Sequence, residues 1–405
     1  MIDLIIVIIL YIYTLCLTGV KARKTKLITD RAVEGDRERE YHVFEDMLAG
    51  KWKGIKRHEG VGSSVTIWLF PYLIHRLTRL NPELVFKLFP CFIYSAVPVF
   101  IYLIARQFLD PAYSALATFY VLSTFFFVGY NITGRLGVAL GFMSGSILAL
   151  LTGHTLIASV LVMLVVMSHY GTSYYMLYVL GASWIVLLIL TIGLSPDILS
   201  ISIVLAVLAA SWFVWYRLIF HHVGDVGISF VKSSVLFTSE TLNAPVYTPA
   251  PDGSLNVRPK GTVDGKSKIQ AMTSLENRDP LLQVAFGRTW QYLDVHQKVE
   301  LFLSWLTVVL MTAGLILSIL WMGLTFYIIL AIVAFSSIVI SVAIPHVSVY
   351  YGVARTYLTS LILLAPCFAV GVEALAGLIG INGYIMGFGI VIAYGLCVSK
   401  ILRGL

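Results

Sequence analysis

The sequence predicts an all-α polytopic membrane protein with about eleven transmembrane helices. Of its 405 residues, 59% are hydrophobic and only 12% are charged, whereas soluble proteins average roughly 25% charged residues. Repeated apolar runs of about 18 residues or more are long enough to cross a bilayer as helices. Most of the charge is confined to two polar segments, residues 21–88 and 221–300.

The apolar runs give the order of the predicted spans. The first covers residues 2–20, and ten more follow at 84–105, 112–130, 136–153, 155–169, 173–194, 198–219, 300–320, 322–344, 356–379 and 382–399. A further run at 63–80 is short and ends in Arg76 and Arg79, which favours an interfacial or re-entrant helix. Pro90 and Pro98 lie inside one span, where neighbouring helices can accommodate a kink.

Three parts follow from this pattern. Residues 1–220 form an N-terminal membrane domain whose first long loop, residues 21–83, is rich in acids and bases. Residues 221–299 form a polar extramembrane segment, with turn-forming Pro and Gly at 248–253 and a candidate short strand at Val226–Leu236. Residues 300–405 are the C-terminal membrane helices.

The net charge of +7 lies beside membrane helices. This position favours membrane lipids, through headgroup phosphates or a phosphate-bearing lipid, as partners and argues against nucleic acid. The four cysteines all fall in apolar runs without CxxC spacing, so neither a disulfide framework nor a zinc site is expected. They are Cys16, Cys91, Cys367 and Cys397.

The parity of the spans places the polar groups on one side of the membrane. Because each span carries the chain to the opposite face, the loops at 21–83, 131–135, 170–172, 221–299 and 345–355 share a face. Their ionisable residues predict a membrane enzyme or binding protein with one working face; they include Asp36, Arg135, His169, His221, His222, Arg288, His346 and Arg355. Basic residues follow the first span directly, which by the positive-inside rule makes this face cytoplasmic, although the rule weakens for loops longer than ~60 residues.

Several motifs stand in order along the chain. Gly35-Asp36 is followed by Glu40-Tyr41, by Trp52 and by Val-Phe-Lys-Leu-Phe-Pro at 85–90. Ser-His-Tyr-Gly-Thr-Ser-Tyr occupies 168–174, and Gly-Val-Ala-Arg at 352–355 precedes Ala-Pro at 365–366. Over residues 30–375 the set resembles a largely uncharacterised archaeal family of multi-pass membrane proteins grouped with the GT-C glycosyltransferases. The chain differs in having Gly171 where the family more often has Ser, and in lacking helices that often precede the acidic loop.

The resemblance implies a GT-C fold in the cell membrane. Enzymes of this type hold one or two acidic residues in the first long loop, on the extracytoplasmic face, and take a sugar from a polyisoprenyl-phosphate donor. That orientation is opposite to the one that the positive-inside rule gives. The convergence of polar groups on one face holds for either orientation.

The first loop supplies the predicted catalytic residues, Asp36 and Glu40. They are four residues apart and therefore share one face of a helix. A carboxylate can take the proton from an acceptor hydroxyl, and the same two residues could hold a divalent cation, Mg²⁺ or Mn²⁺. Neutralisation by Arg37 and Arg39 is the structural alternative. Another face of this helix is expected to be solvated; it carries Glu38, His42 and Glu45.

The predicted substrate-binding residues lie at the ends of spans. His169 and Tyr170 form a polar corner, and His169 either binds substrate or makes structural hydrogen bonds. Arg135 and Arg355 each lie close to a glycine and are suited to bidentate phosphate recognition. The alternative for both arginines is snorkelling to the headgroups.

Two functional hypotheses remain open at the level of sequence. The first is a GT-C-like transferase that moves a sugar from a lipid-phosphate donor to a lipid or surface acceptor. The second is a non-enzymatic transporter or scaffold for lipid-linked saccharides. Transporters often contain an internal repeat with broken helices, and no such repeat is found in this sequence.

Overall fold

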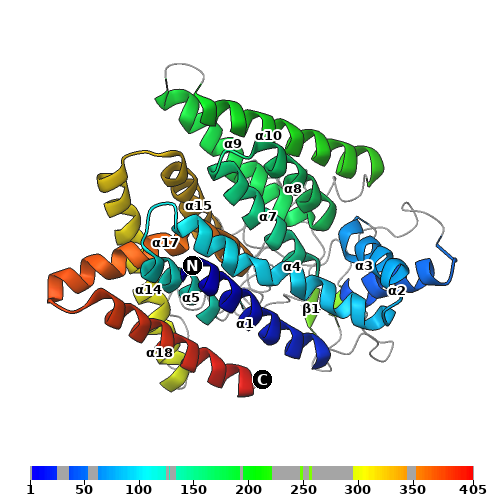
Figure 1. Cartoon of the computed structure of the whole chain (residues 1–405), viewed down its shortest axis with the longest axis horizontal. Coiled ribbons are helices and arrows are strands. Elements are labelled where there is room, and N and C mark those ends of the chain that lie inside the picture. Colours follow the sequence, from blue (N-terminus) through cyan, green and yellow to red (C-terminus); the bar gives the residue numbers. More distant parts are fainter. Residues whose placement is uncertain are drawn as a thin grey trace.

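Helices form most of the structure, which is a computed structural model (Figure 1). It describes residues 2–24, 36–52, 63–124, 127, 134–191, 195–220, 247–249, 255–257, 295–343 and 353–404. The N-terminal helices are α1 (Ile2–Lys24), α2 (Asp36–Leu48), α3 (Val65–Thr78), α4 (Pro82–Ala105), α5 (Pro111–Ser123), α7 (Arg135–Leu151), α8 (Thr155–Ser168), α9 (Tyr170–Leu190), α10 (Pro196–Trp212) and the π-helix η2 (Phe213–Ile219). The C-terminal helices are α14 (Val295–Met322), α15 (Phe326–Ala343), α17 (Val353–Ile379) and α18 (Gly383–Gly404).

The helices bear out a multi-pass membrane protein. Within the described residues, 6 helices are long and apolar enough to cross a membrane; they are α1, α4, α9, α10 continued into η2, α14 and α17. The apolar helices α7, α8, α15 and α18 also occupy predicted spans, but their described apolar stretches are shorter. α5 has 13 residues and is about 20 Å long at 1.5 Å per residue, which is less than the ~30 Å hydrocarbon core.

Two helices form the centre of the bundle. In α4 and in α17, 67% of the apolar window is buried, against 17% in α1 and 22% in α10. α1 therefore packs along α4 with one side and exposes the other, which carries Ile5, Ile9 and Ile12. Such a face is suited to contact with lipid tails.

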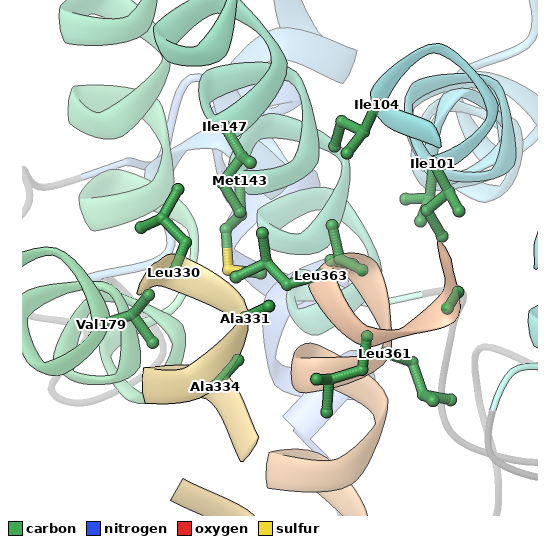
Figure 2. Close-up of a cluster of buried hydrophobic side chains, with 14 of the residues drawn as sticks. Ile101, Ile104, Met143, Ile147, Val179, Leu330, Ala331, Ala334, Leu361 and Leu363 are labelled. Carbon is green, nitrogen blue, oxygen red and sulfur yellow. The ribbon is translucent and has the colours of Figure 1, made fainter. Parts of the chain in front are cut away.

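The core lies where α4, α7, α9, α15 and α17 meet. Figure 2 shows Ile101 and Ile104 of α4 near Leu361 and Leu363 of α17, with Met143 of α7 beside them. The side chains of these residues are buried almost completely. α4 continues as one helix through Pro90 and Pro98, as its neighbours allow.

α14 and α17 approach each other closely at two glycines. A Cβ built on Gly371 of α17 would collide with the backbone carbonyl of Leu310, and one on Gly314 of α14 would collide with that of Cys367. Small residues at membrane-helix crossings permit this close backbone packing. The crossing fixes α17 against α14 in the middle of the bundle.

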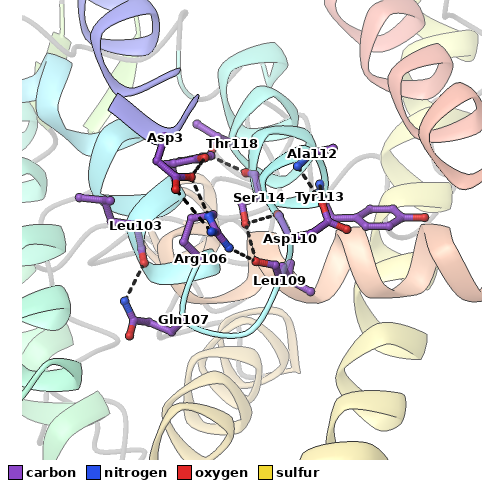
Figure 3. A network of polar contacts seen from close by, with 11 residues as sticks. Asp3, Leu103, Arg106, Gln107, Leu109, Asp110, Ala112, Tyr113, Ser114 and Thr118 are labelled. Carbon is purple, nitrogen blue, oxygen red and sulfur yellow. Dashed lines mark hydrogen bonds and ion pairs between the residues drawn. The ribbon is translucent and has the colours of Figure 1, made fainter. Parts of the chain in front are cut away.

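A polar network lies at the end of the bundle where α1 begins and α4 ends (Figure 3). Arg106 Nε donates to Asp3 Oδ1 at 2.8 Å, and the Tyr102 hydroxyl donates to the same oxygen at 2.5 Å. Asp110 Oδ1 accepts from the backbone N–H of Ala112 at 2.8 Å and so caps α5. These contacts tie the loop between α4 and α5 to the start of the chain.

The strands in the described part of the polar segment form one short hairpin. β1 (Tyr247–Pro249) pairs antiparallel with β2 (Leu255–Val257), on either side of the turn residues predicted at 248–253. The strand expected at Val226–Leu236 lies outside the described residues. The four cysteines are free, as predicted.

Candidate functional site

α2 carries the acidic motif and is docked against the bundle. Its apolar residues Tyr41 and Phe44 contact Phe86 of α4, with ring centroids 5.1 and 5.2 Å apart. Because Glu40 precedes Tyr41, the docking carries Glu40 into the interface, where it is 1% exposed. The helix predicted in the first loop is therefore a packed element.

Glu40 meets the first residue of α7. Arg135 Nε lies 3.6 Å from Glu40 Oε1, and the two side chains are 15% and 2% exposed. An arginine at a helix N-terminus opposes the helix dipole, so helix stability does not explain its position. Its position is better explained by the carboxylate of Glu40 that it faces.

His169 lies between α8 and α9, where it caps the start of α9. Its Nδ1 accepts a hydrogen bond from the backbone N–H of Thr172 at 3.1 Å, and the Thr172 hydroxyl lies 3.0 Å from the same nitrogen. Since an N–H can only donate, Nδ1 is unprotonated and the ring proton resides on Nε2. Nδ1 of His169 therefore makes a structural hydrogen bond, which was one of the two alternatives expected from the sequence. The other nitrogen, Nε2, carries the proton and is a hydrogen-bond donor.

Two arginines lie close enough to this histidine to affect its charge. Burial, and after it the positive charges of Arg135 and Arg355, lower the pKa of His169 well below its usual range. His169 is therefore neutral at physiological pH. Arg355 lies in the first turn of α17 and is half-buried. Arg135 and Arg355 thus act on His169 from positions 34 and 186 residues away in the sequence, and Arg135 also faces Glu40 of the acidic helix.

We call Glu40, Arg135, His169, Tyr170 and Arg355 the site cluster. Two guanidinium groups, one carboxylate and a neutral imidazole give the cluster a net positive charge. Three helices, α7, α9 and α17, also begin here, and helix N-termini favour negative charge. The arrangement is therefore suited to an anionic ligand such as a phosphate.

Tyr170 is the first residue of α9 and completes the corner. Its ring stacks on that of His169, with centroids 5.3 Å apart. The corner is braced from α3 by a hydrogen bond of 2.7 Å between the hydroxyls of Thr66 and Ser168. Trp215 Nε1 donates to the carbonyl of Ser63 at 2.9 Å and fixes the start of α3 against η2. Sequence reasoning did not identify Thr66 or Trp215, although Ser63-Ser64 before an apolar run is a typical helix-start signal.

Asp36 is the first residue of α2, one helical turn before Glu40. Its side chain lies outside the described residues. The helical phase predicted for Asp36 and Glu40 agrees with α2, because both residues belong to one continuous helix.

The prediction that Glu38 lies on a solvated face is wrong. Glu38 is 8% exposed, whereas His42 and Glu45 are 47% and 41% exposed and form an ion pair of 3.2 Å. The reason is that α2 packs against α3 in addition to the aromatic contact with α4. A helix packed on more than one neighbour buries a wider face than a single apolar stripe indicates.

Glu40, one of the two residues predicted as metal ligands, fits a divalent cation poorly, whereas the side chain of Asp36 lies outside the described residues. Glu40 faces a guanidinium at 3.6 Å, and that positive charge disfavours a cation at the same carboxylate. In the part of the chain that the structure describes, no three His, Cys, Asp or Glu side chains come together as a ligand group.

The remaining ionisable residues expected on this face, His221, His222, Arg288 and His346, lie outside the described residues. Comparison with known proteins finds no protein-family model and no curated protein that matches the chain.

Proposed function

We propose that this chain is a membrane glycosyltransferase of the GT-C type, which transfers a sugar from a polyisoprenyl-phosphate-linked donor to a lipid or cell-surface acceptor. The observation that carries the proposal is the site cluster. Arg135 and Arg355 act on His169 from two different helices, and Glu40 holds Arg135 in place. The likeness of the ordered motifs to the GT-C family supports the same function.

In this proposal the arginines bind the donor phosphate. The acceptor hydroxyl oxygen forms a bond to the anomeric carbon of the sugar, and the bond from that carbon to the phosphate oxygen breaks. Its electron pair stays on the polyisoprenyl phosphate, which thereby gains negative charge. Positive charge that is fixed beforehand at the leaving group lowers the barrier of such a step. Arg135 and Arg355 supply this charge, and the Nε2–H of the neutral His169 adds a hydrogen-bond donor.

Asp36 is the base in this proposal. Glu40 is less suited to the role, because a carboxylate beside a guanidinium is a weaker base than a free one. Asp36 lies one turn earlier on α2 and takes the proton of the acceptor hydroxyl as the new bond forms. The carboxylate is then neutral, and the proton returns to water when the product leaves.

The test is a transfer assay in membranes that contain the full chain, with radiolabelled polyisoprenyl-phosphate sugars as donors. We expect transfer from at least one donor, and a fall of ~10²–10⁴-fold for Asp36→Asn because the general base is lost. Glu45→Gln is the control, since Glu45 is 41% exposed and contacts His42 and Tyr41 of the same helix.

Arg355→Gln tests the phosphate contact. A hydrogen bond to a charged group contributes about 1.5–3 kcal/mol, so we expect kcat/KM to fall roughly 10- to 150-fold. Donor binding without transfer by the wild-type chain would support a transporter or scaffold of lipid-linked saccharides. Equal activity of Asp36→Asn and Glu45→Gln would remove the catalytic role of Asp36.

The working face is extracytoplasmic in this proposal, and the protein is a multi-pass protein of the cell membrane. Lys51, which is exposed just after α2, reports the orientation. After replacement of the four native cysteines, Lys51→Cys should react with a membrane-impermeant thiol reagent in intact cells. Reaction only after lysis would place this face in the cytoplasm.

A further inference from the structure

The corner between α3 and α4 exposes an apolar surface beside the candidate site. α3 ends at Thr78 and α4 begins at Pro82. Four leucines of the corner are exposed, by 44%, 84%, 53% and 49%; they are Leu73, Leu77, Leu80 and Leu84. Leu73 and Leu77 are four residues apart on α3 and so share one side of that helix, whereas Leu80 lies in the turn and Leu84 in the first turn of α4. Leu77 is among the most exposed large apolar residues in the described part of the chain.

Basic side chains border these leucines. Arg76 and Arg79 are both exposed, and the guanidinium of Arg76 lies 5.9 Å from the ring centroid of Tyr72. The nearby Glu83 pairs with Lys87 at 2.6 Å, so these two charges offset each other. The corner therefore has positive charge next to apolar surface.

The corner is a fixed structure. Arg79 has a φ of 55°, and its backbone N–H donates to the carbonyl of His75 at 2.7 Å. His75 Nδ1 donates to the carbonyl of Leu80 at 2.6 Å, and Asn81 caps α4 by accepting from the N–H of Leu84 at 3.1 Å. The leucines are thus held outward by hydrogen bonds that close the turn.

We propose that this corner binds the anionic phospholipid headgroups of the adjacent leaflet. Its leucines insert at the boundary between headgroups and acyl chains, and Arg76 and Arg79 contact the lipid phosphates. Short apolar surfaces bordered by arginine bind anionic membranes, because the apolar side chains partition into the interface and the arginines are attracted to the negative charge of the lipid headgroups. The other end of α3 contacts Ser168, next to His169, so α3 joins this surface to the site cluster. The inference is independent of the proposed function.

The experiment uses the full chain without its native cysteines, carrying Leu77→Cys labelled with an environment-sensitive fluorophore. The protein is reconstituted in mixed bilayers of zwitterionic and anionic phospholipid, and either lipid class carries brominated acyl chains that quench the label. We expect quenching by both classes, with several-fold stronger quenching per brominated anionic lipid. Each basic residue near an anionic surface raises affinity by a factor of about five. The preference should weaken at high salt.

Arg76→Gln with Arg79→Gly removes both charges and keeps the fold of the corner, because glycine is favoured at positive φ. This variant should lose the anionic preference and retain quenching. Arg39→Gln with Lys51→Gln is the matched control, since it removes two exposed charges that belong to α2 and the residues after it, and not to the corner between α3 and α4, and it should keep the preference.

Three outcomes would overturn the proposal. A label that no brominated lipid quenches and that aqueous iodide reaches would place the corner in water. If the label became protected in native membranes only, a protein partner would cover this surface instead. Equal quenching by the two lipid classes would remove the role of the arginines.

Discussion

Replacing Gly371 by alanine should destabilise the protein through the α14–α17 crossing. A Cβ at this position meets the carbonyl oxygen of Leu310, and lies 2.7 Å from its carbonyl carbon and 3.1 Å from its Cα. Ordinary contact begins at 3.4 Å, so the helices must part by at least 0.7 Å at the carbonyl carbon, and by more at the oxygen. The three atoms nearest to the methyl group all belong to the backbone of Leu310, so side-chain rotation does not relieve the collision.

The expected magnitude follows from two opposing terms. Overpacking of a rigid interior costs about 1–3 kcal/mol, and the backbone collision places Gly371→Ala near the upper end. Alanine in place of glycine within a helix regains about 1 kcal/mol. We therefore expect a net loss of about 2 kcal/mol in the free energy of unfolding, which for a chain of 405 residues corresponds to a fall in Tm of roughly 2 °C.

Gly377→Ala is the matched control on the same helix. No atom lies within 4 Å of a Cβ at Gly377, so only the helix-propensity term remains and Tm should hold or rise. The assay is thermal unfolding of both variants in one detergent, followed by tryptophan fluorescence. Leu310→Ala combined with Gly371→Ala should not restore Tm, because the collision is with the Leu310 backbone. A Tm for Gly371→Ala at or above that of the wild type would contradict the close crossing.

Two further predictions concern the site cluster. Removing one partner of a buried ion pair leaves the other charge uncompensated, at a cost of about 3–5 kcal/mol. Arg135→Gln should therefore lower thermal stability by more than Glu40→Gln does, because the charge it leaves behind is on Glu40, which is 2% exposed, against 15% for Arg135. Additive effects in a double-mutant cycle on Tm would contradict the 3.6 Å ion pair. Burial and the two arginines lower the pKa of His169 in the folded chain. Below pH ~6.5 the unfolded chain therefore binds a proton at this residue that the folded chain does not. As a result, His169 reduces the stability of the fold as the pH falls from about 6.5 towards the folded-state pKa. His169→Asn, which can still cap α9, should therefore show a smaller loss of Tm between pH 7 and pH 5 than the wild type, and parallel pH profiles would contradict the buried neutral histidine.

The sequence by itself determined that the protein is built of apolar helices of membrane type, and it predicted which polar residues share one face of the membrane. Apolar runs separated by short polar connectors leave no alternative to membrane helices, because a bilayer requires each backbone group to be satisfied within its own segment. Parity predicted that Arg135, His169 and Arg355 share a face, and in the structure both arginines lower the pKa of His169. The eleven spans on which parity depends remain a prediction, since 6 of the described helices are long and apolar enough to cross a membrane.

Only the tertiary structure decided how the acidic helix is used. Glu38 and Glu40 carry the same charge two residues apart, and local sequence gave no reason for both to be buried. Their burial results from neighbours distant in sequence, among them Phe86 against Tyr41 and Phe44, and Arg135 against Glu40. Likewise, the close crossing at Gly314 and Gly371 exists only when α14 and α17 are packed. The composition of each segment determines that it becomes a helix, whereas the partner that each face meets depends on the three-dimensional arrangement of all of them.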